Sequence, residues 1–358
     1  MMKKIMVVTG SLGAGGIEKV SSLIADYFIG KGYEVSICCL LQTEENTFAP
    51  PRKDVKVFYF NTSKGLDRPK ILISGDWIKF LKEKFEEEKP DCVLAMTLKI
   101  GALCSIARKN KPIRLSFRET SDPFSKVRNR PLDRLLCLIC RKIDGIIFQT
   151  EWEKKCYPQY MQRKGRVIPN PISVDAMWDK NAIEKTIVSL GRLTNIQKRH
   201  DILIQAFALF LKDNPGYELK IYGNGEDKEE DEKLIKSLGI EPFVKIIDAK
   251  KNIHSLISKV SMFVITSDFE GLSNALAEAM LMGIPCISSD WPGSEDVITH
   301  NVNGYVYKRQ NVAELASYMN KLANDDEKKV EFSVRAQRLQ RHFDPKIVME
   351  AYSKIIEG

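Results

Sequence analysis

Short apolar runs alternate with helical segments along almost the whole chain, and this alternation constrains the fold more than any other feature. In the first half, apolar runs at 5–9, 35–41, 55–60, 92–95, 114–116 and 143–149 are separated by segments such as 18–31 and 77–88. Repeated strand–helix–strand units favour a parallel sheet, and right-handed crossovers place helices on both of its faces. We therefore predict an α/β fold with a doubly wound parallel sheet.

The alternation begins again after a rigid hinge. Val167-Ile168-Pro169-Asn170-Pro171 ends the first series, and two prolines restrict the chain there. Further apolar runs follow at 186–190, 219–222, 244–247, 262–266 and 286–288. Because 358 residues exceed one ordinary domain, we predict an N-terminal domain at 1–168 and a C-terminal domain at 169–344. The terminal helix, 345–358, is expected to pack back on the first domain.

Composition excludes several classes of protein. No apolar run approaches the roughly 18 residues of a membrane span, and the basic start leads into a strand rather than a secretory signal. We expect a cytoplasmic protein whose eight cysteines are reduced core residues. Cys137 and Cys140 have redox or metal spacing but no second pair beside them, so we interpret them as helix filler. The four histidines show no metal-ligand spacing.

Two glutamates bracket a polar turn that opens a helix near the C-terminal end. Glu270 and Glu278 stand either side of 271–274, after the apolar run 262–266, and the helix is expected to end at Gly283. A helix N-terminus binds anions, while carboxylates bind sugar hydroxyls. Eight residues of helix turn through about 800°, so the two glutamates differ by about 80° and suit different parts of one ligand.

Other polar groups follow neighbouring predicted strands. Arg192 and Lys198 come after 186–190, and a forked guanidinium with an ammonium suits a diphosphate. Ligands bind beyond the carboxyl ends of strands in such sheets. A solvated basic loop and plain connecting turns are the alternative readings. The candidate binding residues after the next two strands are Gly223, Asn224, Ala249 and Asn252.

A glycine turn follows the first strand. Gly15 and Gly16 would let the backbone approach a phosphate at a helix N-terminus. The pattern departs from the nicotinamide fingerprint, because Glu18 stands where its last glycine is required. A tight turn without a ligand is the alternative.

Taken in order, these motifs resemble the retaining glycosyltransferases of family 4. The Gly-Gly turn, the Ile-Pro-Asn-Pro hinge, Gly-Arg-Leu with Gln-Lys, Tyr-Gly-x-Gly and the paired glutamates carry the resemblance over essentially the whole chain. It implies the GT-B fold, with two Rossmann-like domains facing across a cleft. It also implies transfer of a hexose or N-acetylhexosamine from a nucleoside diphosphate sugar, expected to be a UDP-sugar. The acceptor implied is a polyprenyl-diphosphate-linked glycan, and neither a metal nor another cofactor is expected.

The resemblance implies a role for each candidate. Arg192 and Lys198 would bind the donor diphosphate and stabilise it as it leaves. Glu278 would bind the ribose hydroxyls, and Glu270 would contact the transferred sugar. Gly15 and Gly16 would leave room for the donor phosphate. Backbone amides on sugar and phosphate would come from Gly271, Leu272, Ser273 and Asn274.

The first domain departs from the family pattern. Many members carry a histidine there that touches the sugar, but no histidine precedes His200 in this chain. The stretch from Ser116 to Pro123 is similar to that of members that build lipid-linked oligosaccharides and surface polysaccharides. We expect Arg118 and Glu119 to take the histidine's place at the sugar or acceptor. A surface ion pair near a strand end is the alternative.

Basic residues are concentrated between 108 and 142, where eleven of them face three acids. This excess predicts an anionic partner, and a basic amphipathic helix at 131–142 favours an anionic membrane surface at the inner face of the cytoplasmic membrane. Packing of that helix on its own sheet remains the alternative. Nucleic acid is not expected, because interleaved aromatic residues are missing.

Two other functions fit the same fold. A non-catalytic protein that binds sugar nucleotides or polyanions would use the same residues, and a UDP-sugar epimerase would need acid–base histidines that the sequence does not show. The donor sugar, the acceptor, the linkage, the general base and the oligomeric state stay open at this point.

Overall fold

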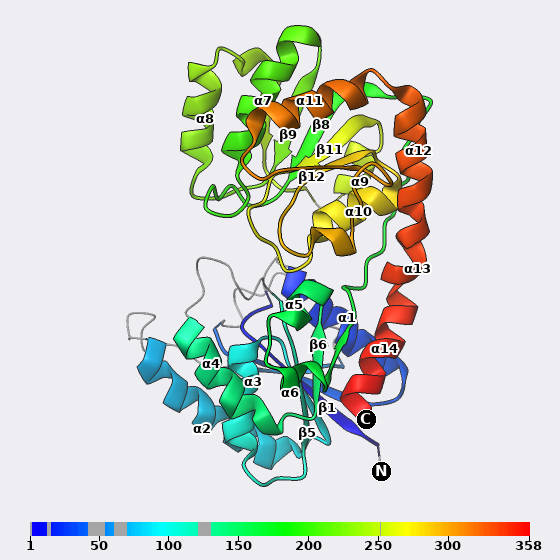
Figure 1. Ribbon diagram of the computed structural model, residues 1–358. Coiled ribbons are helices and arrows are strands. Elements are labelled where there is room, and N and C mark those ends of the chain that lie inside the picture. The colour runs from blue at the N-terminus through cyan, green and yellow to red at the C-terminus, as the bar shows by residue number, and fades with distance from the viewer. Residues whose placement is uncertain (1, 13–15, 42–53, 61–69, 121–129, 251) are drawn as a thin grey trace. The chain divides into compact units, whose positions relative to one another are not determined.

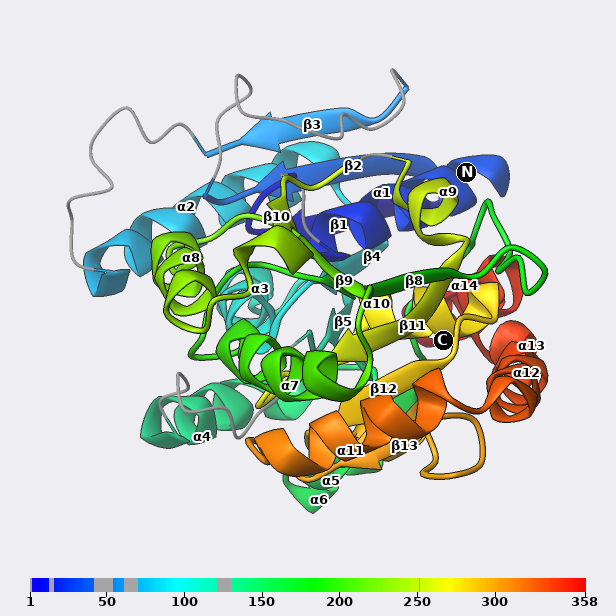
Figure 2. The ribbon, with the colours of Figure 1, turned by 90° about the horizontal axis from the view of Figure 1, so that it is seen from above.

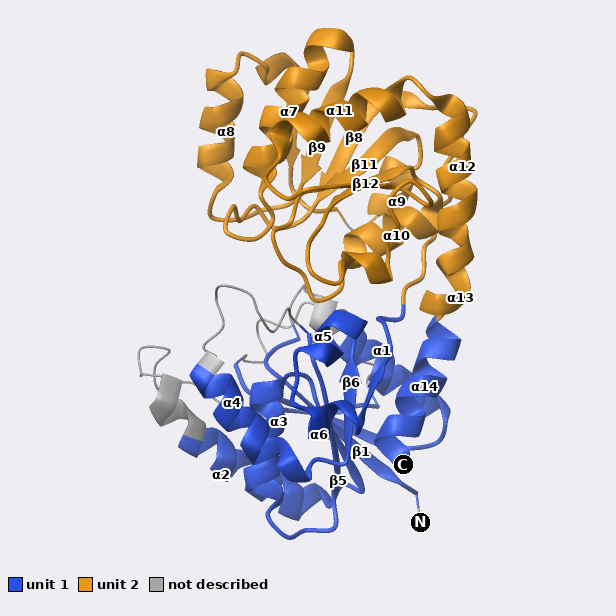
Figure 3. Cartoon of the chain, in the orientation of Figure 1, with its two compact units in different colours: residues 1–171, 345–358 blue, residues 172–344 orange. Residues whose placement is uncertain are grey.

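A computed structural model describes residues 2–12, 16–41, 54–60, 70–120, 130–250 and 252–358. The chain forms two compact units, coloured separately in Figure 3. Unit 1 comprises residues 1–171 and 345–358, and unit 2 comprises residues 172–344. The structure therefore divides the chain after Pro171, whereas the sequence predicted the division after residue 168. The terminal helix belongs to unit 1.

Unit 1 is built on a seven-stranded parallel sheet in the order β3-β2-β1-β4-β5-β6-β7. The order reverses at β1, which is the signature of a doubly wound sheet. Its strands are β1 (Lys4–Thr9), β2 (Glu34–Cys39), β3 (Lys56–Tyr59), β4 (Cys92–Ala95), β5 (Arg114–Arg118), β6 (Gly145–Phe148) and β7 (Gly165–Val167). Its helices are α1 (Gly16–Gly30), α2 (Lys70–Glu88), α3 (Leu98–Arg108), α4 (Arg130–Ile139), η2 (Cys140–Lys142), α5 (Glu151–Lys155), α6 (Gln159–Gln162) and α14 (Pro345–Glu357) (Figure 1).

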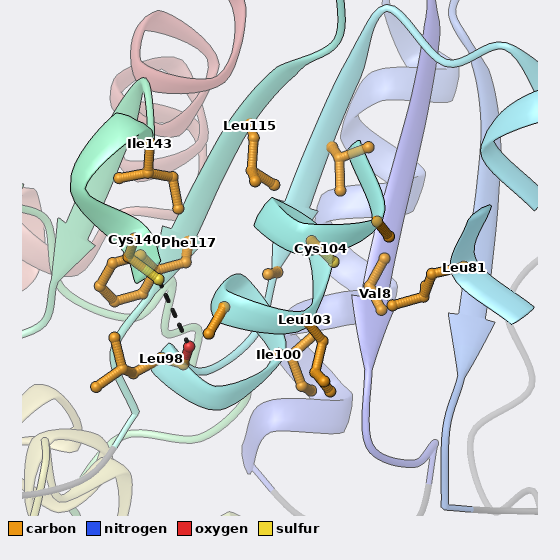
Figure 4. Close-up of a cluster of buried hydrophobic side chains, with 14 of the residues drawn as sticks. Val8, Leu81, Leu98, Ile100, Leu103, Cys104, Leu115, Phe117, Cys140 and Ile143 are labelled. Atoms are coloured by element: carbon orange, nitrogen blue, oxygen red, sulfur yellow. Dashed lines mark hydrogen bonds between the residues drawn. The ribbon is translucent and has the colours of Figure 1, made fainter. Parts of the chain in front are cut away.

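Alternating side chains of β1 explain why unit 1 has a hydrophobic core on each face of its sheet. Met6 and Val8 join the cluster formed with α2, α3 and η2, shown in Figure 4. Ile5 and Val7 join the opposite cluster, which α1 and α14 complete. Successive strand residues point to opposite faces, so a continuous apolar run is buried on both sides.

The cysteines behave as core residues. Cys137 and Cys140 are buried, which agrees with their interpretation as helix filler. The Cys140 thiol lies 4.0 Å from the Leu98 carbonyl oxygen (Figure 4). Burial raises the pKa of Cys140 to about 12, so this thiol stays protonated and unreactive at neutral pH.

Unit 2 repeats the architecture with a six-stranded parallel sheet in the order β10-β9-β8-β11-β12-β13. Figure 2 shows β8, β11, β12 and β13 in succession. Its strands are β8 (Glu184–Leu190), β9 (Glu218–Tyr222), β10 (Val244–Ile247), β11 (Val260–Ile265), β12 (Cys286–Ser289) and β13 (Tyr305–Tyr307). Its helices are α7 (His200–Asp213), α8 (Lys228–Ser237), η3 (Glu241–Phe243), α9 (Ile253–Ile257), α10 (Asn274–Met282), η4 (Ser294–Asp296), α11 (Val312–Ala323), α12 (Asp326–Ala336), η5 (Gln337–Leu339) and α13 (Gln340–Phe343).

The sequence prediction missed β13, the edge strand of unit 2. This strand has only three residues and contains no long apolar run. It forms because β12 offers an unpaired edge, and Ile287, Ser288 and Ser289 take Tyr305, Val306 and Tyr307 as parallel partners. A pairing of this kind depends on tertiary structure rather than on local pattern.

Candidate functional site

The predicted binding residues of unit 2 gather at one edge of its sheet. The strands β10, β9, β8 and β11 are neighbours and run parallel, so the segments that leave their carboxyl ends meet at that edge. These segments are 248–252, 223–227, 191–199 and 266–274. The carboxyl edge of a parallel sheet is the usual ligand-binding edge of such folds.

Glycines let two of these segments interlock. A Cβ on Gly223 would lie 1.8 Å from the Gly191 carbonyl oxygen, and one on Gly225 would lie 2.2 Å from that of Leu193. Any larger residue would therefore push the loops apart. The Leu193 N–H donates to the Asn224 carbonyl at 3.0 Å. This close approach fixes the backbone that carries Arg192.

Glu270 is the centre of a buried polar cluster. Its Oε1 accepts from the Ser267 hydroxyl at 2.6 Å and forms an ion pair with Lys198. Its Oε2 accepts from the Gln197 amide at 3.3 Å. The glutamate is only 7% exposed, and a buried carboxylate needs such partners to stay ionised. The arrangement holds a charged carboxylate and a charged amine side by side at the strand ends.

Tertiary contacts hold Lys198 in place. The Thr266 hydroxyl donates to the Lys198 carbonyl at 2.8 Å, which ties the end of β11 to the loop after β8. Arg199 follows with a φ of 54°, in the left-handed region, just before α7 begins. The Asp268 N–H also donates to the Gln197 carbonyl at 2.8 Å. The loops after β8 and β11 therefore form one connected surface.

Arg192 differs from its neighbours because it is exposed. Its guanidinium has no ion pair or hydrogen bond with any residue that the structure describes. It lies six residues before Lys198 in the same loop. An unpaired guanidinium beside a paired amine can accept a bidentate anion such as a phosphate.

Helix α10 begins at the polar turn, as the sequence predicted. Ser273 is its N-cap and accepts from the Leu276 N–H at 3.4 Å, while Gly283 ends it with a φ of 87°. Gly271 and Leu272 are buried, and Asn274 is the first helical residue. The unpaired N–H groups of a first helical turn carry positive potential, and in α10 this turn begins four residues after Glu270 in the sequence.

Glu278 lies one turn into α10 and contacts a histidine that sequence reasoning missed. Its Oε2 lies 3.4 Å from His254 Nε2, and His254 Nδ1 lies 2.6 Å from Asp175 Oδ1. The three residues are separated by 79 and 24 positions, so no local pattern could reveal them. The sequence signal for this group is limited to its two acidic residues, Asp175 and Glu278, and acidic residues are common in the chain.

The remaining donor-side candidates lie around the same sheet edge or outside the described residues. Asn224, Ala249 and Asn252 are exposed in the segments after β9 and β10. Gly16 is the first residue of α1. The predicted role of Gly15 falls outside the described residues.

Arg118 and Glu119, which the sequence predicted to contact the sugar or acceptor, are buried residues of unit 1. Each is 1% exposed. Arg118 donates to the Tyr352 hydroxyl at 2.8 Å, to Gln149 Oε1 at 2.9 Å and to Asn170 Oδ1. Glu119 accepts from the Tyr157 hydroxyl. In this structure the two groups bind neighbouring segments of their own unit, and their predicted contact with sugar or acceptor stays a prediction.

Sequence reasoning also missed Glu153, a fully buried carboxyl near this pair. It accepts from the Gln149 N–H at 2.6 Å. Burial, with Glu119 nearby, raises the pKa of Glu153 to about 8. The acid is therefore largely protonated at neutral pH, which suits a structural rather than a catalytic position.

The described residues offer neither a metal site nor a helix that could span a membrane. No group of three or more histidine, cysteine or acidic side chains is placed to hold a metal ion in the described part of the chain. No described helix combines the length and apolar character needed to cross a bilayer.

Comparison with protein families assigns both halves of the chain. The family described as "Glycosyl transferases group 1" matches residues 175–339, and "Glycosyltransferase Family 4" matches residues 14–176. An uncharacterized glycosyltransferase of Haemophilus influenzae is 25% identical over 369 residues, covering 99% of this chain and 100% of the relative. A Campylobacter jejuni alpha-1,4-N-acetyl-D-galactosaminyltransferase, whose name gives an undecaprenol-PP-linked substrate, is 25% identical over 99% of this chain and 98% of the relative.

Solved structures share the fold. Anabaena HepE in complex with UDP and glucose has a TM-score of 0.81 at 18% identity, over 99% of both chains. The lipopolysaccharide outer core galactosyltransferase WaaB has a TM-score of 0.78 at 20% identity, over 99% of both chains.

Proposed function

The chain belongs to glycosyltransferase family 4 and has the GT-B fold, and from this premise we propose that it is a retaining, metal-independent enzyme. The donor proposed is a UDP-sugar that carries a hexose or N-acetylhexosamine. The acceptor proposed is a polyprenyl-diphosphate-linked glycan in the assembly of a surface polysaccharide or other glycan. The observation that carries the proposal is the convergence of Arg192, Lys198, Glu270 and the start of α10 at one sheet edge.

The donor assignment follows from the chemistry of that edge. A diphosphate needs donors and positive charge, which Arg192, Lys198 and the first turn of α10 can supply. The sugar needs hydroxyl acceptors, which the Glu270 carboxylate can supply. HepE, which shares the fold, was solved with UDP and with UDP-glucose, and this supports uridine as the nucleoside of the donor.

Charge stabilisation accounts for the proposed reaction. When the bond from the sugar to the diphosphate breaks, negative charge builds on the leaving oxygen. Arg192 and Lys198 are placed to stabilise that charge as a metal ion does elsewhere, and the Lys198–Glu270 ion pair keeps the amine in position. The leaving diphosphate would accept the acceptor proton on the same face, which gives retention without a covalent nucleophile.

The acceptor assignment is supported by relatives. Two Campylobacter jejuni enzymes that match 99% of this chain, at 25% and 23% identity, are named for undecaprenol-PP or diphospho-undecaprenol substrates. An acceptor of that kind is anchored in a membrane, so the enzyme would work at a membrane surface.

A direct test measures UDP release from a panel of UDP-sugars, with a chelator present, in the wild type and in Glu270→Ala and Arg192→Ala. We expect each substitution to reduce turnover by about 100-fold or more. Arg166→Ala, an exposed arginine of unit 1, is the matched control and should keep full activity. Unchanged activity in both site variants would overturn the site assignment. Tight UDP binding without turnover of any donor would favour a non-catalytic binding protein.

Helix α4 supports the proposed contact with an anionic membrane. It buries Cys137 against its own unit. Its opposite face exposes three leucines, Leu132, Leu135 and Leu138, by 46%, 53% and 60%. Arg134 and Arg141 are exposed beside them. An apolar stripe flanked by arginines suits the interface of a bilayer that contains anionic lipids.

Vesicle sedimentation tests this contact. The wild type should bind vesicles of phosphatidylglycerol and phosphatidylethanolamine, and should bind pure phosphatidylcholine vesicles weakly. Replacement of Leu135 and Leu138 by serine should reduce binding to the anionic vesicles by about tenfold. Leu209→Ser, an exposed leucine of unit 2, is the matched control. Equal binding by all three proteins would exclude α4 as the contact surface.

A further inference from the structure

His254 lies between two carboxylates in unit 2. Its Nδ1 is 2.6 Å from Asp175 Oδ1, in the segment before β8, and its Nε2 is 3.4 Å from Glu278 Oε2, on α10. The side chains of His254 and Glu278 are 11% and 16% exposed, whereas that of Asp175 is 74% exposed. The ring therefore connects a solvent-facing carboxylate to one that is largely buried.

Both contacts are satisfied at once only by a protonated ring. An ionised carboxylate only accepts hydrogen bonds, and a neutral imidazole carries one N–H, so the imidazolium alone can donate to both partners. The Asp175 backbone N–H also lies 3.4 Å from Nδ1, which would suit a neutral ring. The shorter contact, from Nδ1 to the Asp175 carboxylate, would then place a lone pair against a negative oxygen.

The charged groups that act on the ring are these two carboxylates. The hydrogen bond to Glu278, followed by that to Asp175, raises the pKa of His254 above its ordinary value, against the opposing effect of burial. The other residues of α9, apart from His254 itself, are uncharged. The imidazolium form therefore extends to higher pH than in a free histidine.

We propose that His254 is a positioning residue, which in its protonated form orients Glu278 toward the ribose hydroxyls of the nucleotide donor. The inference rests on the proposed assignment of Glu278 to the ribose. A glutamate has three rotatable side-chain bonds, and a charged hydrogen bond to one oxygen removes much of that freedom before the donor arrives. Deprotonation withdraws the charge, so nucleotide affinity falls as pH rises through the pKa of His254.

The test is UDP affinity, measured by calorimetry at about pH 6 and about pH 9. UDP itself titrates, so the quantity compared is the ratio of the wild-type Kd to that of His254→Gln at each pH. The glutamine amide can still donate to Glu278 but does not titrate. We expect the wild type to bind UDP about fivefold more tightly than the variant at the lower pH, with the difference gone at the higher pH.

Two further variants make the result decisive. His342→Gln, an exposed histidine of the same unit, should follow the wild type at both pH values. Glu278→Ala should lose UDP affinity at both, and if it does not, the ribose assignment itself fails. If Glu278→Ala loses affinity while His254→Gln and the wild type share one pH profile, or if the wild-type advantage appears only at high pH, the positioning role of His254 alone is overturned.

Discussion

Each unit carries a basic and an acidic residue at or beyond the carboxyl ends of its strands, yet the two sets have different surroundings. In unit 1, the Arg118 guanidinium donates hydrogen bonds to three side chains of its own unit, and the residue is 1% exposed. In unit 2, Lys198 and Glu270 bind each other, and the loop that carries Lys198 also carries Arg192, which is exposed and has no ion pair or hydrogen bond among the described residues. The difference teaches that a position at a strand end does not make a site, because a ligand also needs accessible charge.

The partners of Arg118 indicate a structural purpose. Asn170 belongs to the hinge that leaves unit 1, and Tyr352 belongs to α14, where the chain returns to it. Gln149 follows β6. One buried guanidinium thus connects the exit and the return of the chain to the sheet.

The largest expected effect is on activity and comes from Arg192. Arg192→Met should reduce kcat/KM by about 100-fold or more, because the leaving diphosphate loses a cation. Its free energy of unfolding should stay within about 0.5 kcal/mol of the wild type, since the side chain is exposed. Steady-state kinetics and urea unfolding measure the two quantities. A large loss of stability would contradict the contrast between the units.

The matched change in unit 1 should have the opposite character. Arg118→Met leaves the oxygens of Gln149 and Asn170 without their donor inside the protein, and should reduce the free energy of unfolding by about 3 kcal/mol. Urea unfolding checks this. A variant as stable as the wild type, but inactive, would return Arg118 to the catalytic site.

A smaller loss of stability is expected from the interlocked loops of unit 2. Gly223→Ala would bring a methyl group against the Gly191 carbonyl and should cost about 2 kcal/mol, with weaker UDP binding. Gly30→Ala, in α1 of unit 1, has nothing within 4 Å of the added carbon and should not destabilise the protein. Thermal unfolding with and without UDP compares them, and equal behaviour would show that the loops do not interlock as described.

A last effect depends on pH and concerns the raised pKa of Glu153. Its pKa of about 8 exceeds the usual 4.5, so the native state favours the protonated acid. The contribution of the protonated acid to the free energy of unfolding is complete below pH 4.5 and is lost as pH rises toward about 8. Glu153→Gln should therefore unfold like the wild type near pH 4, and should be more stable than the wild type by about 4 kcal/mol near pH 8. Parallel pH curves would show that Glu153 is ionised throughout.

Much of the architecture was predictable from local pattern. The strands β4 and β10 appear at the predicted residues, and α10 begins and ends at its polar turn and at Gly283. Such elements are encoded by neighbouring residues. The strand β13 was missed because its pairing with β12 is non-local.

The candidate site was predictable only in part. Arg192, Lys198 and Glu270 follow strands that a doubly wound sheet brings together, so topology alone places them at one edge. His254 and Asp175 could not be found this way, because the contacts from Asp175 to His254 and from His254 to Glu278 join a loop, a short helix and α10. The burial of Arg118 and Glu119 was not visible in the sequence, and their predicted role stays a prediction.

The sequence by itself determined two α/β units, the hinge between their strand series and the strand ends where polar residues collect, because hydrophobic periodicity and turn chemistry are local properties. Only the tertiary structure decided which charges are available. Arg118 and Arg192 both follow or end strands, and what separates them is the set of side chains that surrounds each guanidinium. Burial depends on the packing of distant segments, so it emerges only when the whole unit has folded.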